Sequence, residues 1–547
     1  MEDIYILIND CISNLSCQFT FHNLSQLSTI SKYNSCLIYQ LKIHDHDKQP
    51  IYYTSTNQIK KFHNIDTLTI SKYYSYKNLT ELTQIKNIRF YNMQCTDNIT
   101  KMFHLTSCDL INTEDKKPIL VPYFHTHLSR LYVFHNSRKI YNIKDIISFT
   151  HLTNINAIKL RNCNDIEQFR GFINLRSLTI RVLKNLSKLS LFQSLHSLTI
   201  DCNIDTGYDL LIINHPTITN IKILHCERFE IQNCHELIHL ILIDSKTGVF
   251  DSNISRLKTL ILETNYDFYD EMNINFDINE YINLEYLEYN CTIKNFTYLS
   301  SNLIKLHSLN LGCGAKIDVD GTVANNLTFI YLHTCACEFD FNKYTNLKQL
   351  ILTDTPNINI DKLVQLEYLN LCNLNSQHKI LSINCINYQK LTYLSLTNYK
   401  IINLNRSNKL NKLMICLANN IDIMNIWNND LKYLPKLTFL NLHATQIVES
   451  EWYSTKILDT SNLSNCLNLK HLGCNFLLND LSLLININRL NIYYHESYRN
   501  ILCKLTKLTN LHILLSERID KIDIRNLKRL NRASTHDFIL PEITTIE

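Results

Sequence analysis

The chain has 547 residues, of which 45% are hydrophobic and 19% are charged, so most of it should fold rather than stay disordered. Glycine and proline number only 7 each, which excludes glycine-rich phosphate-binding loops, collagen-like tracts and proline-rich linkers. The net charge is +4, from 54 basic and 50 acidic residues, and this balance argues against nucleic acid as the main partner.

The N-terminal residues 1–45 are expected to contain helices at roughly 3–14 and 23–40. Acidic residues stand where a signal peptide needs positive ones, and no stretch of the chain approaches 18 uninterrupted apolar residues. The 19 cysteines are an odd number scattered along the chain, which is typical of free thiols in a reducing compartment. We therefore expect a cytoplasmic protein that does not bind a membrane.

Within this region, the segment 22–43 contains a leucine-rich stretch that leads into a short polar turn with an aromatic residue. Its residues resemble the second half of an F-box at Leu24, Leu27, Ile30, Ser31, Lys32, Tyr33 and Leu37. The Leu-Pro opening that F-boxes usually carry is missing. The resemblance implies docking of a Skp-type adaptor through residues 1–45, and the alternative is a plain helical cap over residues 1–50.

A six-residue pattern, apolar-x-x-apolar-x-apolar, recurs 21 times from residue 65 to residue 513, about 22 residues apart on average. Clear copies are LRSLTI (175–180), LKQLIL (347–352) and LTYLSL (391–396). The last apolar positions alternate with polar ones, which is the periodicity of a β-strand. Strands this short cannot bury their apolar side alone, so the copies are expected to stack in parallel around one continuous core.

The pattern resembles the leucine-rich-repeat consensus L-x-x-L-x-L-x-x-N/C-x-L, because the ninth position carries Asn or Cys at Asn136, Cys163, Asn203, Cys226, Asn265 and Cys335. The resemblance implies an α/β repeat fold, a leucine-rich-repeat solenoid curved as a horseshoe with its parallel sheet on the concave face. We expect an N-terminal cap at 1–50, the solenoid at 51–526 and a C-terminal cap at 527–547. Copies about 20 residues apart leave little room for regular helices, so the return segments should be extended or single turns.

Four intervals between copies are long, at 128–154, 257–283, 410–436 and 437–468. Insertions in repeat arrays map to loops on one face. The only two tryptophans, Trp427 and Trp452, fall in the last two intervals. Each is either an anchor for a partner or a core residue that packs a local helix against the convex wall.

Two short motifs look like metal chemistry. His235-Glu236-Leu237-Ile238-His239 spells the HExxH signature, but it overlaps a predicted strand, where residues four apart are about 13 Å from each other. Two imidazoles at that distance cannot share one zinc ion. Cys335-Ala336-Cys337 includes a ninth-position cysteine, for which a structural role is expected. We therefore predict no metal, no cofactor and no catalytic site.

Positions three, five and seven of each copy are expected on the solvent side of the sheet. In copies 284 to 437, position three is aromatic at Tyr286, Phe329, Tyr368, Tyr393 and Phe439, and Tyr331 adds a ring at position five. Exposed rings of this kind anchor protein partners, although aromatic residues also simply suit strands. In copies 128 to 218, a modest basic stripe contains Arg130, Lys159, Arg161 and Arg181, which is either ordinary solvated charge or a surface for an acidic partner.

The repeat and the lack of an assembled active site favour a non-catalytic scaffold that binds a protein partner through the concave face. The alternative is an F-box substrate receptor of a cullin-type ubiquitin ligase, with residues 1–45 docking the adaptor. The identity of the partner does not follow from the sequence.

Overall fold

The computed structural model describes residues 67–71, 86–91, 104–111, 127–134, 154–161, 172–181, 189–202, 210–250, 254–264, 273–275, 277–290, 297–312, 317–334, 339–355, 359–374, 382–417, 420–444, 457–474, 476–493, 498–502, 504–514, 522–523, 527, 532–533, 538–539 and 545–546. The expected N-terminal cap and F-box-like segment lie outside these residues. Trp452, Cys335 and Cys337 also lie outside them. The chain divides into two compact units, unit 1 (Met1–Tyr281) and unit 2 (Ile282–Glu547).

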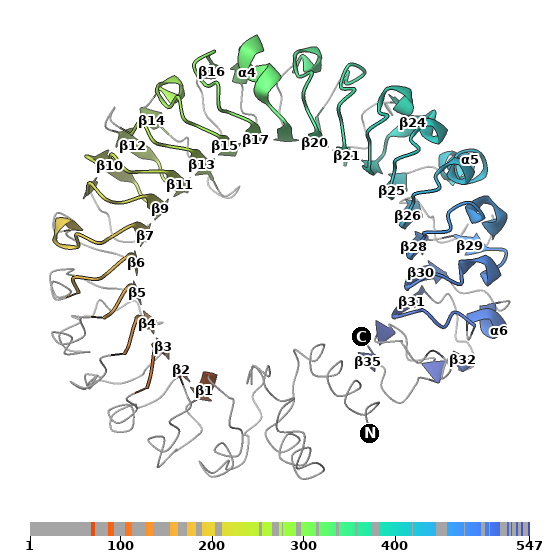
Figure 1. Ribbon diagram of the computed structural model, residues 1–547, viewed down its shortest axis with the longest axis horizontal. Helices are drawn as coiled ribbons and strands as arrows, with labels where there is room; N and C mark the ends of the chain where they lie inside the picture. Colours follow the sequence, from red (N-terminus) through yellow and green to blue (C-terminus); the bar gives the residue numbers. More distant parts are fainter. Residues whose placement is uncertain are drawn as a thin grey trace, which may run out of the picture. The chain divides into compact units, whose positions relative to one another are not determined.

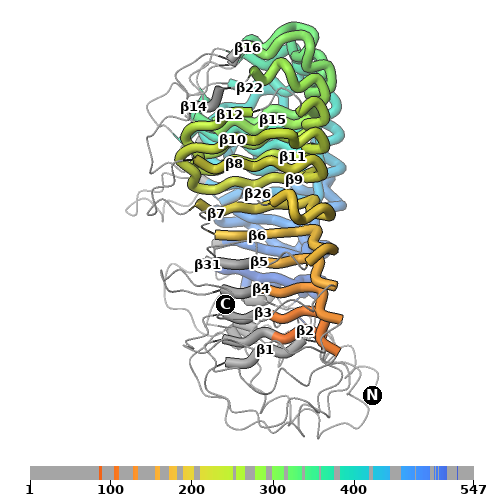
Figure 2. Tube along the Cα trace, turned by 90° about the vertical axis from the view of Figure 1, so that its left-hand side faces the viewer, coloured from red at the N-terminus to blue at the C-terminus, as the bar shows by residue number. Residues whose placement is uncertain are grey.

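Unit 1 is built on a parallel sheet in which each strand pairs in register with the strand of the next repeat. Figure 2 shows this stacking clearly for the strands labelled β5, β6 and β7. The described strands of this main sheet are, in spatial order, β1 (Thr67–Ser71), β2 (Asn87–Tyr91), β3 (Ser107–Ile111), β4 (Arg130–Phe134), β5 (Ala157–Arg161), β6 (Ser177–Arg181), β7 (Ser197–Asp201), β9 (Asn220–Leu224), β11 (His239–Ile243) and β13 (Thr259–Glu263).

Unit 2 has a main sheet of the same construction. Its described strands are, in spatial order, β15 (Tyr286–Asn290), β17 (Ser308–Gly312), β19 (Phe329–His333), β20 (Gln349–Thr353), β21 (Tyr368–Cys372), β23 (Tyr393–Thr397), β25 (Lys412–Leu417), β26 (Phe439–Ala444), β28 (His471–Cys474), β30 (Arg489–Tyr493), β31 (Asn510–Leu514), β33 (Arg532–Ala533) and β35 (Thr545–Ile546). The last two strands show that the parallel ladder continues into residues 527–547.

The repeat pattern explains these strands, because each of the 21 predicted copies begins a strand at its third position. In the copy that contains β23, Leu391, Leu394 and Leu396 are almost completely buried, while Tyr393 and Ser395 between them are half-exposed. Wherever the structure describes the side chains of a main-sheet strand, its apolar side enters the core shared with its neighbours, as the strand periodicity predicts. The opposite side, made by positions three, five and seven, stays in contact with solvent.

The residue directly after several strands adopts a left-handed backbone conformation. In this conformation its backbone N–H still bonds to the next strand although the chain turns there. This eighth position has a positive φ at His225, Asp244, Thr334, Asp354 and Asn398. In each case the backbone N–H donates a hydrogen bond of 2.7 or 2.8 Å to a carbonyl at the end of the next strand. Asn and Asp tolerate this conformation well, whereas the β-branched Thr334 does so at a cost.

The return segments carry short elements on the side opposite the main sheets (Figure 1). Unit 1 has an outer parallel sheet of β8 (Leu211–Asn214), β10 (Arg228–Gln232), β12 (Thr247–Phe250) and β14 (Asn273–Asn275), and the single 3-10 turns η6 (Leu189–Leu191) and η8 (Ile278–Glu280). Unit 2 has the outer pairs β16 (Thr297–Leu299) with β18 (Ile317–Val319), β22 (Ser382–Asn384) with β24 (Lys400–Ile402), β27 (Ile457–Leu458) with β29 (Leu477–Leu478), and β32 (Ile522–Asp523) with β34 (Phe538–Ile539).

Helical structure is sparse among the described residues, which confirms the expectation from the repeat spacing. Unit 2 contains α4 (Gly321–Asn326), α5 (Asn420–Asn429) and α6 (Arg499–Leu502), with the 3-10 turns η9 (Phe341–Lys343), η10 (Cys385–Asn387), η11 (Leu404–Arg406), η12 (Leu431–Tyr433), η14 (Thr460–Leu463) and η15 (Ser482–Leu484). None of the helices in the described part of the chain is long and apolar enough to span a membrane.

The longest of these helices, α5, occupies the long interval 410–436 and resolves the role of Trp427. This side chain is completely buried, and its indole N–H donates a 2.7 Å hydrogen bond to the backbone carbonyl of Asp459. Of the two interpretations offered by the sequence, packing of a local helix is therefore correct for Trp427. An anchor for a partner would have to be exposed.

Candidate binding face

The solvent side of the unit 2 main sheet places one residue of every strand on a single line, which we call the position-three row. Register pairing joins neighbouring members directly, so that Tyr368 faces Tyr393 and Phe439 faces His471 across adjacent strands. The described row runs in order through Tyr286, Ser308, Phe329, Gln349, Tyr368, Tyr393, Lys412, Phe439, His471, Arg489 and Asn510.

Two pairs of rings in this row stack almost face to face. The centroids of Tyr368 and Tyr393 are 4.1 Å apart with planes 7° from parallel, and those of Phe439 and His471 are 4.1 Å apart with planes 8° from parallel. Strands of one sheet lie about 4.8 Å apart, so the stacking direction runs from strand to strand. The rings therefore stand upright on the sheet, with one face of each ring covered by the other ring of its pair.

The hydroxyl groups of the row are held by neighbouring side chains. The Tyr286 hydroxyl donates a 2.7 Å hydrogen bond to the Glu288 carboxylate, and burial together with this carboxylate raises the pKa of Tyr286 to about 12. The Tyr393 hydroxyl lies 3.3 Å from the sulfur of Met414. Burial, followed by the contact with Tyr393, raises the pKa of Tyr368 to about 12. Tyr286 and Tyr368 are therefore uncharged hydrogen-bonding groups at neutral pH.

The other predicted aromatic residues join the same face without stacking as a pair. Phe329 lies in the position-three row, one strand from Gln349, and Tyr331 lies at position five of the same strand β19. The ring of Tyr331 is 6.4 Å from that of His333 and tilted against it by 47°. The structure thus brings all six predicted aromatic residues to one face of unit 2, where two stacked pairs and one tilted pair of rings are separated by Gln349 and Lys412.

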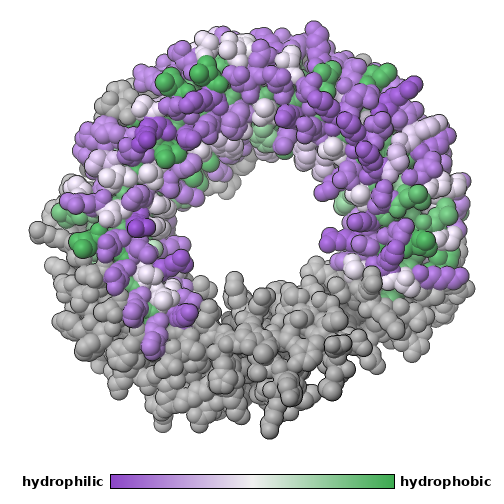
Figure 3. Space-filling view, viewed as in Figure 1, coloured by the Kyte–Doolittle hydropathy of each residue, from purple (hydrophilic) through white to green (hydrophobic). Residues whose placement is uncertain are grey.

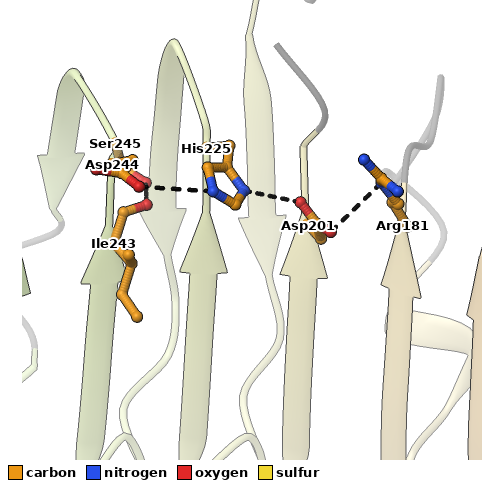
Figure 4. A network of polar contacts seen from close by, with 6 residues as sticks. All are labelled: Arg181, Asp201, His225, Ile243, Asp244 and Ser245. Carbon is orange, nitrogen blue, oxygen red and sulfur yellow. Dashed lines mark hydrogen bonds and ion pairs between the residues drawn. The ribbon is translucent and has the colours of Figure 1, made fainter. Parts of the chain in front are cut away.

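The predicted basic stripe of unit 1 is partly neutralised. Arg181 at the end of β6 lies with its Nε 3.4 Å from the Asp201 carboxylate, and the same carboxylate is 2.9 Å from Nδ1 of His225. Nε2 of His225 is in turn 3.5 Å from the carboxylate of Asp244 (Figure 4). Since Arg181 is tied into this network between strand ends, little of its charge is left for a partner.

The remaining members of the stripe differ in their surroundings. Lys159 lies over the ring of Tyr132, 4.8 Å from its centroid, in a cation–π contact between adjacent strands β4 and β5. Arg130 is exposed on β4, and the side chain of Arg161 lies outside the described part of the structure. The stripe therefore remains a weaker candidate than the row of unit 2.

The HExxH segment is not helical. His235 lies in an exposed turn, Leu237 is buried, and His239 is the first residue of strand β11. The carboxylate of Glu236 pairs with Arg256 of the next turn. The motif thus spans a turn and a strand, as the repeat pattern predicts.

Sequence reasoning missed several residues of the unit 2 face. His471 and Arg489 occupy position three of the two copies that follow the predicted aromatic run, so extending the same positional rule would have found them. Burial lowers the pKa of His471, with a smaller contribution from Arg489, and burial also lowers the pKa of His443. Both imidazoles are therefore neutral near pH 7.

The ninth position of the repeat decides the type of solenoid. Cys226, Ser245 and Thr355 at this position are buried, and each donates a hydrogen bond to a backbone carbonyl two residues away. A buried side chain that bonds the backbone directly after each strand, together with the Leu-rich parallel ladder, defines the architecture. The fold is a leucine-rich-repeat solenoid. Hydrophilic side chains dominate the visible surface of both units of this solenoid in Figure 3, with scattered apolar ones between them.

Comparison with profiles of known protein families finds no match, and comparison with curated proteins finds none either. Among solved structures, the solenoid is similar to the LRR ectodomain of the plant membrane receptor kinase GASSHO1/SCHENGEN3 from Arabidopsis thaliana, in complex with CASPARIAN STRIP INTEGRITY FACTOR 2. The identity is 13% and the TM-score 0.35, over 82% of this chain and 65% of that one. The chain thus spans slightly less than two thirds of that ectodomain.

Two further solved structures are similar to the solenoid. One is an LRR protein from Leptospira interrogans, with 15% identity and a TM-score of 0.29 over 85% of this chain and 94% of that one. The other is TLR13 in complex with ssRNA13, with 16% identity and a TM-score of 0.42 over 88% of this chain and 83% of that one.

Proposed function

We propose that the chain is a non-catalytic interaction scaffold, and that the solvent side of the unit 2 main sheet binds a protein partner. The observation that carries this proposal is the position-three row with its two stacked ring pairs. Large rings that are already held by a neighbour lose little conformational freedom when a partner covers them. Aromatic residues are also the side chains that most often dominate the binding energy of protein interfaces.

The composition of the face supports a protein partner. Next to the rings, it presents Met414 and Arg489, which belong to residue types enriched in interfaces. Between β19 and β23, positions three, five and seven carry no Asp, Glu, Lys or Arg. Such an uncharged centre beside hydroxyl and amide groups can be desolvated at small cost and still align a partner through hydrogen bonds.

Simultaneous replacement of both rings of one stacked pair tests the proposal. We expect Tyr368→Ala with Tyr393→Ala to weaken partner capture at least tenfold while the solenoid stays folded, because both rings are only half-buried. Capture is measured by affinity purification of the full chain from its native cells with quantitative mass spectrometry. Circular dichroism and the thermal midpoint check folding.

Tyr433→Ala is the matched control, because Tyr433 is 49% exposed on η12, away from the main sheet. This variant should retain every partner that the unchanged chain captures. Equal recovery of all partners by the double variant and the unchanged chain would contradict the proposal.

The ubiquitin-ligase hypothesis is supported by the F-box-like residues of segment 22–43 alone. It requires that the full chain bind a purified Skp-type adaptor directly. Binding that survives the Tyr368→Ala and Tyr393→Ala changes would place the adaptor elsewhere and leave the main-sheet face for a substrate.

A further inference from the structure

The C-terminal part of the unit 2 sheet has an unusual distribution of charge. The five segments that lead into neighbouring strands β25, β26, β28, β30 and β31 are 408–412, 434–439, 466–471, 484–489 and 505–510. Together they contain six basic residues and no Asp or Glu. We call these residues the basic patch: Lys409, Lys412, Lys436, Lys470, Arg489 and Lys507.

Two residues of the patch flank one of the stacked ring pairs. Lys412 precedes Phe439 in the position-three row and Arg489 follows His471, so a cation stands on each side of the stack. Since these positions are three strand spacings apart, their Cα atoms are separated by about 14 Å. Lys412 and Arg489 are both exposed.

Among the described residues, no carboxylate stands on the solvent side of the strands that follow these five segments. From β17 to β31, the described residues at positions three, five and seven include neither Asp nor Glu. Within the part of the chain that the structure describes, no ion pair joins a patch residue to a carboxylate. Arg181 of unit 1, which is paired with Asp201, shows the contrast. The uncompensated charge attracts an anionic partner.

Apolar side chains lie in the same segments as the cations. Leu467 and Ile485, in the turns before β28 and β30, are 74% and 59% exposed. These two exposed side chains, on neighbouring turns, add apolar contact area to the charged surface. The surface therefore matches a ligand that carries carboxylates and apolar groups together.

We propose that the basic patch and the Phe439–His471 stack bind an extended acidic polypeptide segment that also carries apolar side chains. The proposal rests on the proposed function and names the class of partner. Carboxylates of the segment pair with Lys412 and Arg489, and its apolar side chains contact the ring edges, Leu467 and Ile485. The ring edges carry partial positive charge, which favours nearby carboxylates.

The orientation of the rings favours a polypeptide over a single-stranded nucleic acid. Nucleic-acid-binding surfaces stack bases on the open faces of aromatic rings. In this sheet one face of Phe439 covers one face of His471, 4.1 Å apart, and the outer face of each ring adjoins Lys412 or Arg489 in the row. A base could stack on an outer face only by inserting between a ring and the neighbouring cation, whereas a polypeptide can contact the ring edges from above.

Fluorescence anisotropy with the full-length chain tests the proposal. The probe is a labelled peptide of about 12 residues in which Glu alternates with Leu, long enough to cross five strands at ~4.8 Å spacing. A peptide with Gln in place of Glu and an oligothymidylate of equal length are the comparison ligands. We expect the acidic peptide to bind at least tenfold more tightly than either, with affinity falling as NaCl rises from about 0.05 to about 0.5 M.

Charge reversal locates the site. Lys412→Glu with Arg489→Glu should weaken binding of the acidic peptide at least tenfold, because attraction becomes repulsion at both ends of the stack. Lys305→Glu with Lys348→Glu is the matched control, since these lysines are exposed in the corresponding segments before β17 and β20. The control variant should bind like the unchanged chain, and both variants should keep the unchanged thermal midpoint within a few degrees.

The other outcomes overturn the proposal. Equal binding of the Gln peptide removes the charge argument, and tighter binding of oligothymidylate assigns the patch to nucleic acid. If both pairs of charge reversals weaken peptide binding equally, the effect comes from the net charge of the chain and not from the basic patch. If the reversal at Lys412 and Arg489 leaves capture of cellular partners intact while Tyr368→Ala with Tyr393→Ala abolishes it, this inference fails and the proposed function stands.

Discussion

The imidazole of His471 lies flat against the ring of Phe439, with 4.1 Å between centroids and 8° between planes. The two residues are 32 positions apart in the sequence and meet only because β26 and β28 pair in register. Every property of the candidate face follows from this rule, since equivalent positions of successive repeats become neighbours. Single substitutions can therefore test the packing of one repeat against the next.

Gly473 and Asn441 provide such a test on the same pair of strands. A Cβ atom at Gly473 would overlap Oδ1 of Asn441, a buried atom with no hydrogen-bond partner among the residues that the structure describes. We expect Gly473→Ala to lower the free energy of unfolding by about 1–3 kcal/mol, because the Asn441 side chain must move. In the background of Asn441→Ala the same change should cost much less. A urea-denaturation cycle of the four variants measures this coupling, and additive costs would contradict it.

Trp427 should matter for stability and not for binding. Trp427→Phe removes the hydrogen bond to the Asp459 carbonyl and leaves a cavity beside α5. We expect the free energy of unfolding to fall by about 2 kcal/mol. Partner capture at a temperature where the variant stays folded should be unchanged. Lost capture at full stability would instead assign Trp427 to an interface.

Thr334 should be replaceable with a gain in stability. It has a φ of 49°, a region that β-branched residues adopt at a cost, and its N–H bond to the Thr353 carbonyl needs only the backbone. We predict that Thr334→Asn raises the free energy of unfolding by about 1 kcal/mol, measured by urea denaturation. Thr353→Asn, at an ordinary strand position, is the control and should be neutral or destabilising.

His215 should make the stability of unit 1 depend on pH. The ring is buried, its Nε2 lies 3.0 Å from the Phe192 carbonyl, and burial lowers its pKa below the usual 6.5. Between the folded and unfolded pKa values, the unfolded chain binds more protons, so stability is complete above pH 6.5 and falls as the pH is lowered. The thermal midpoint measured from pH 7.5 to pH 5 should therefore decrease.

His215→Gln should make this pH dependence less steep, because the amide cannot take up the proton. His307→Gln is the control, since His307 is exposed in unit 2, and this variant should keep the unchanged profile. A midpoint that falls equally steeply without His215 would contradict the assignment.

The sequence predicted the main sheets well because their signal is local and repeated. The hexapeptide LTYLSL alone indicates that Leu391, Leu394 and Leu396 enter the core, and the next copy of the pattern indicates the same for its own apolar residues. The six aromatic residues of the candidate face follow from the same positional rule. Their joint placement on one face therefore needed no structural information.

Other features depend on contacts that no short pattern encodes. Asp201 pairs with both Arg181 and His225, so this network joins three copies, and it weakens one of the two interpretations that the sequence left open for the basic stripe. The left-handed eighth position has no common residue type, because its role is carried by the backbone. The outer sheet of β8, β10, β12 and β14 lies in return segments that share no consensus. Stacking geometry and uncompensated charge became visible only when strand register was known.

Photo-crosslinking at Ser395 tests the central claim most directly. Ser395 is half-exposed on β23, at position five of its copy and next to the position-three row. Ile402 on the outer strand β24 is 40% exposed and serves as the control. A photoreactive phenylalanine derivative at residue 395 should crosslink the full chain to a specific protein in its native cells, and the same group at residue 402 should not. Crosslinks to that protein from residue 402 alone, or equal yields from both positions, would contradict a binding face on the main sheet of unit 2.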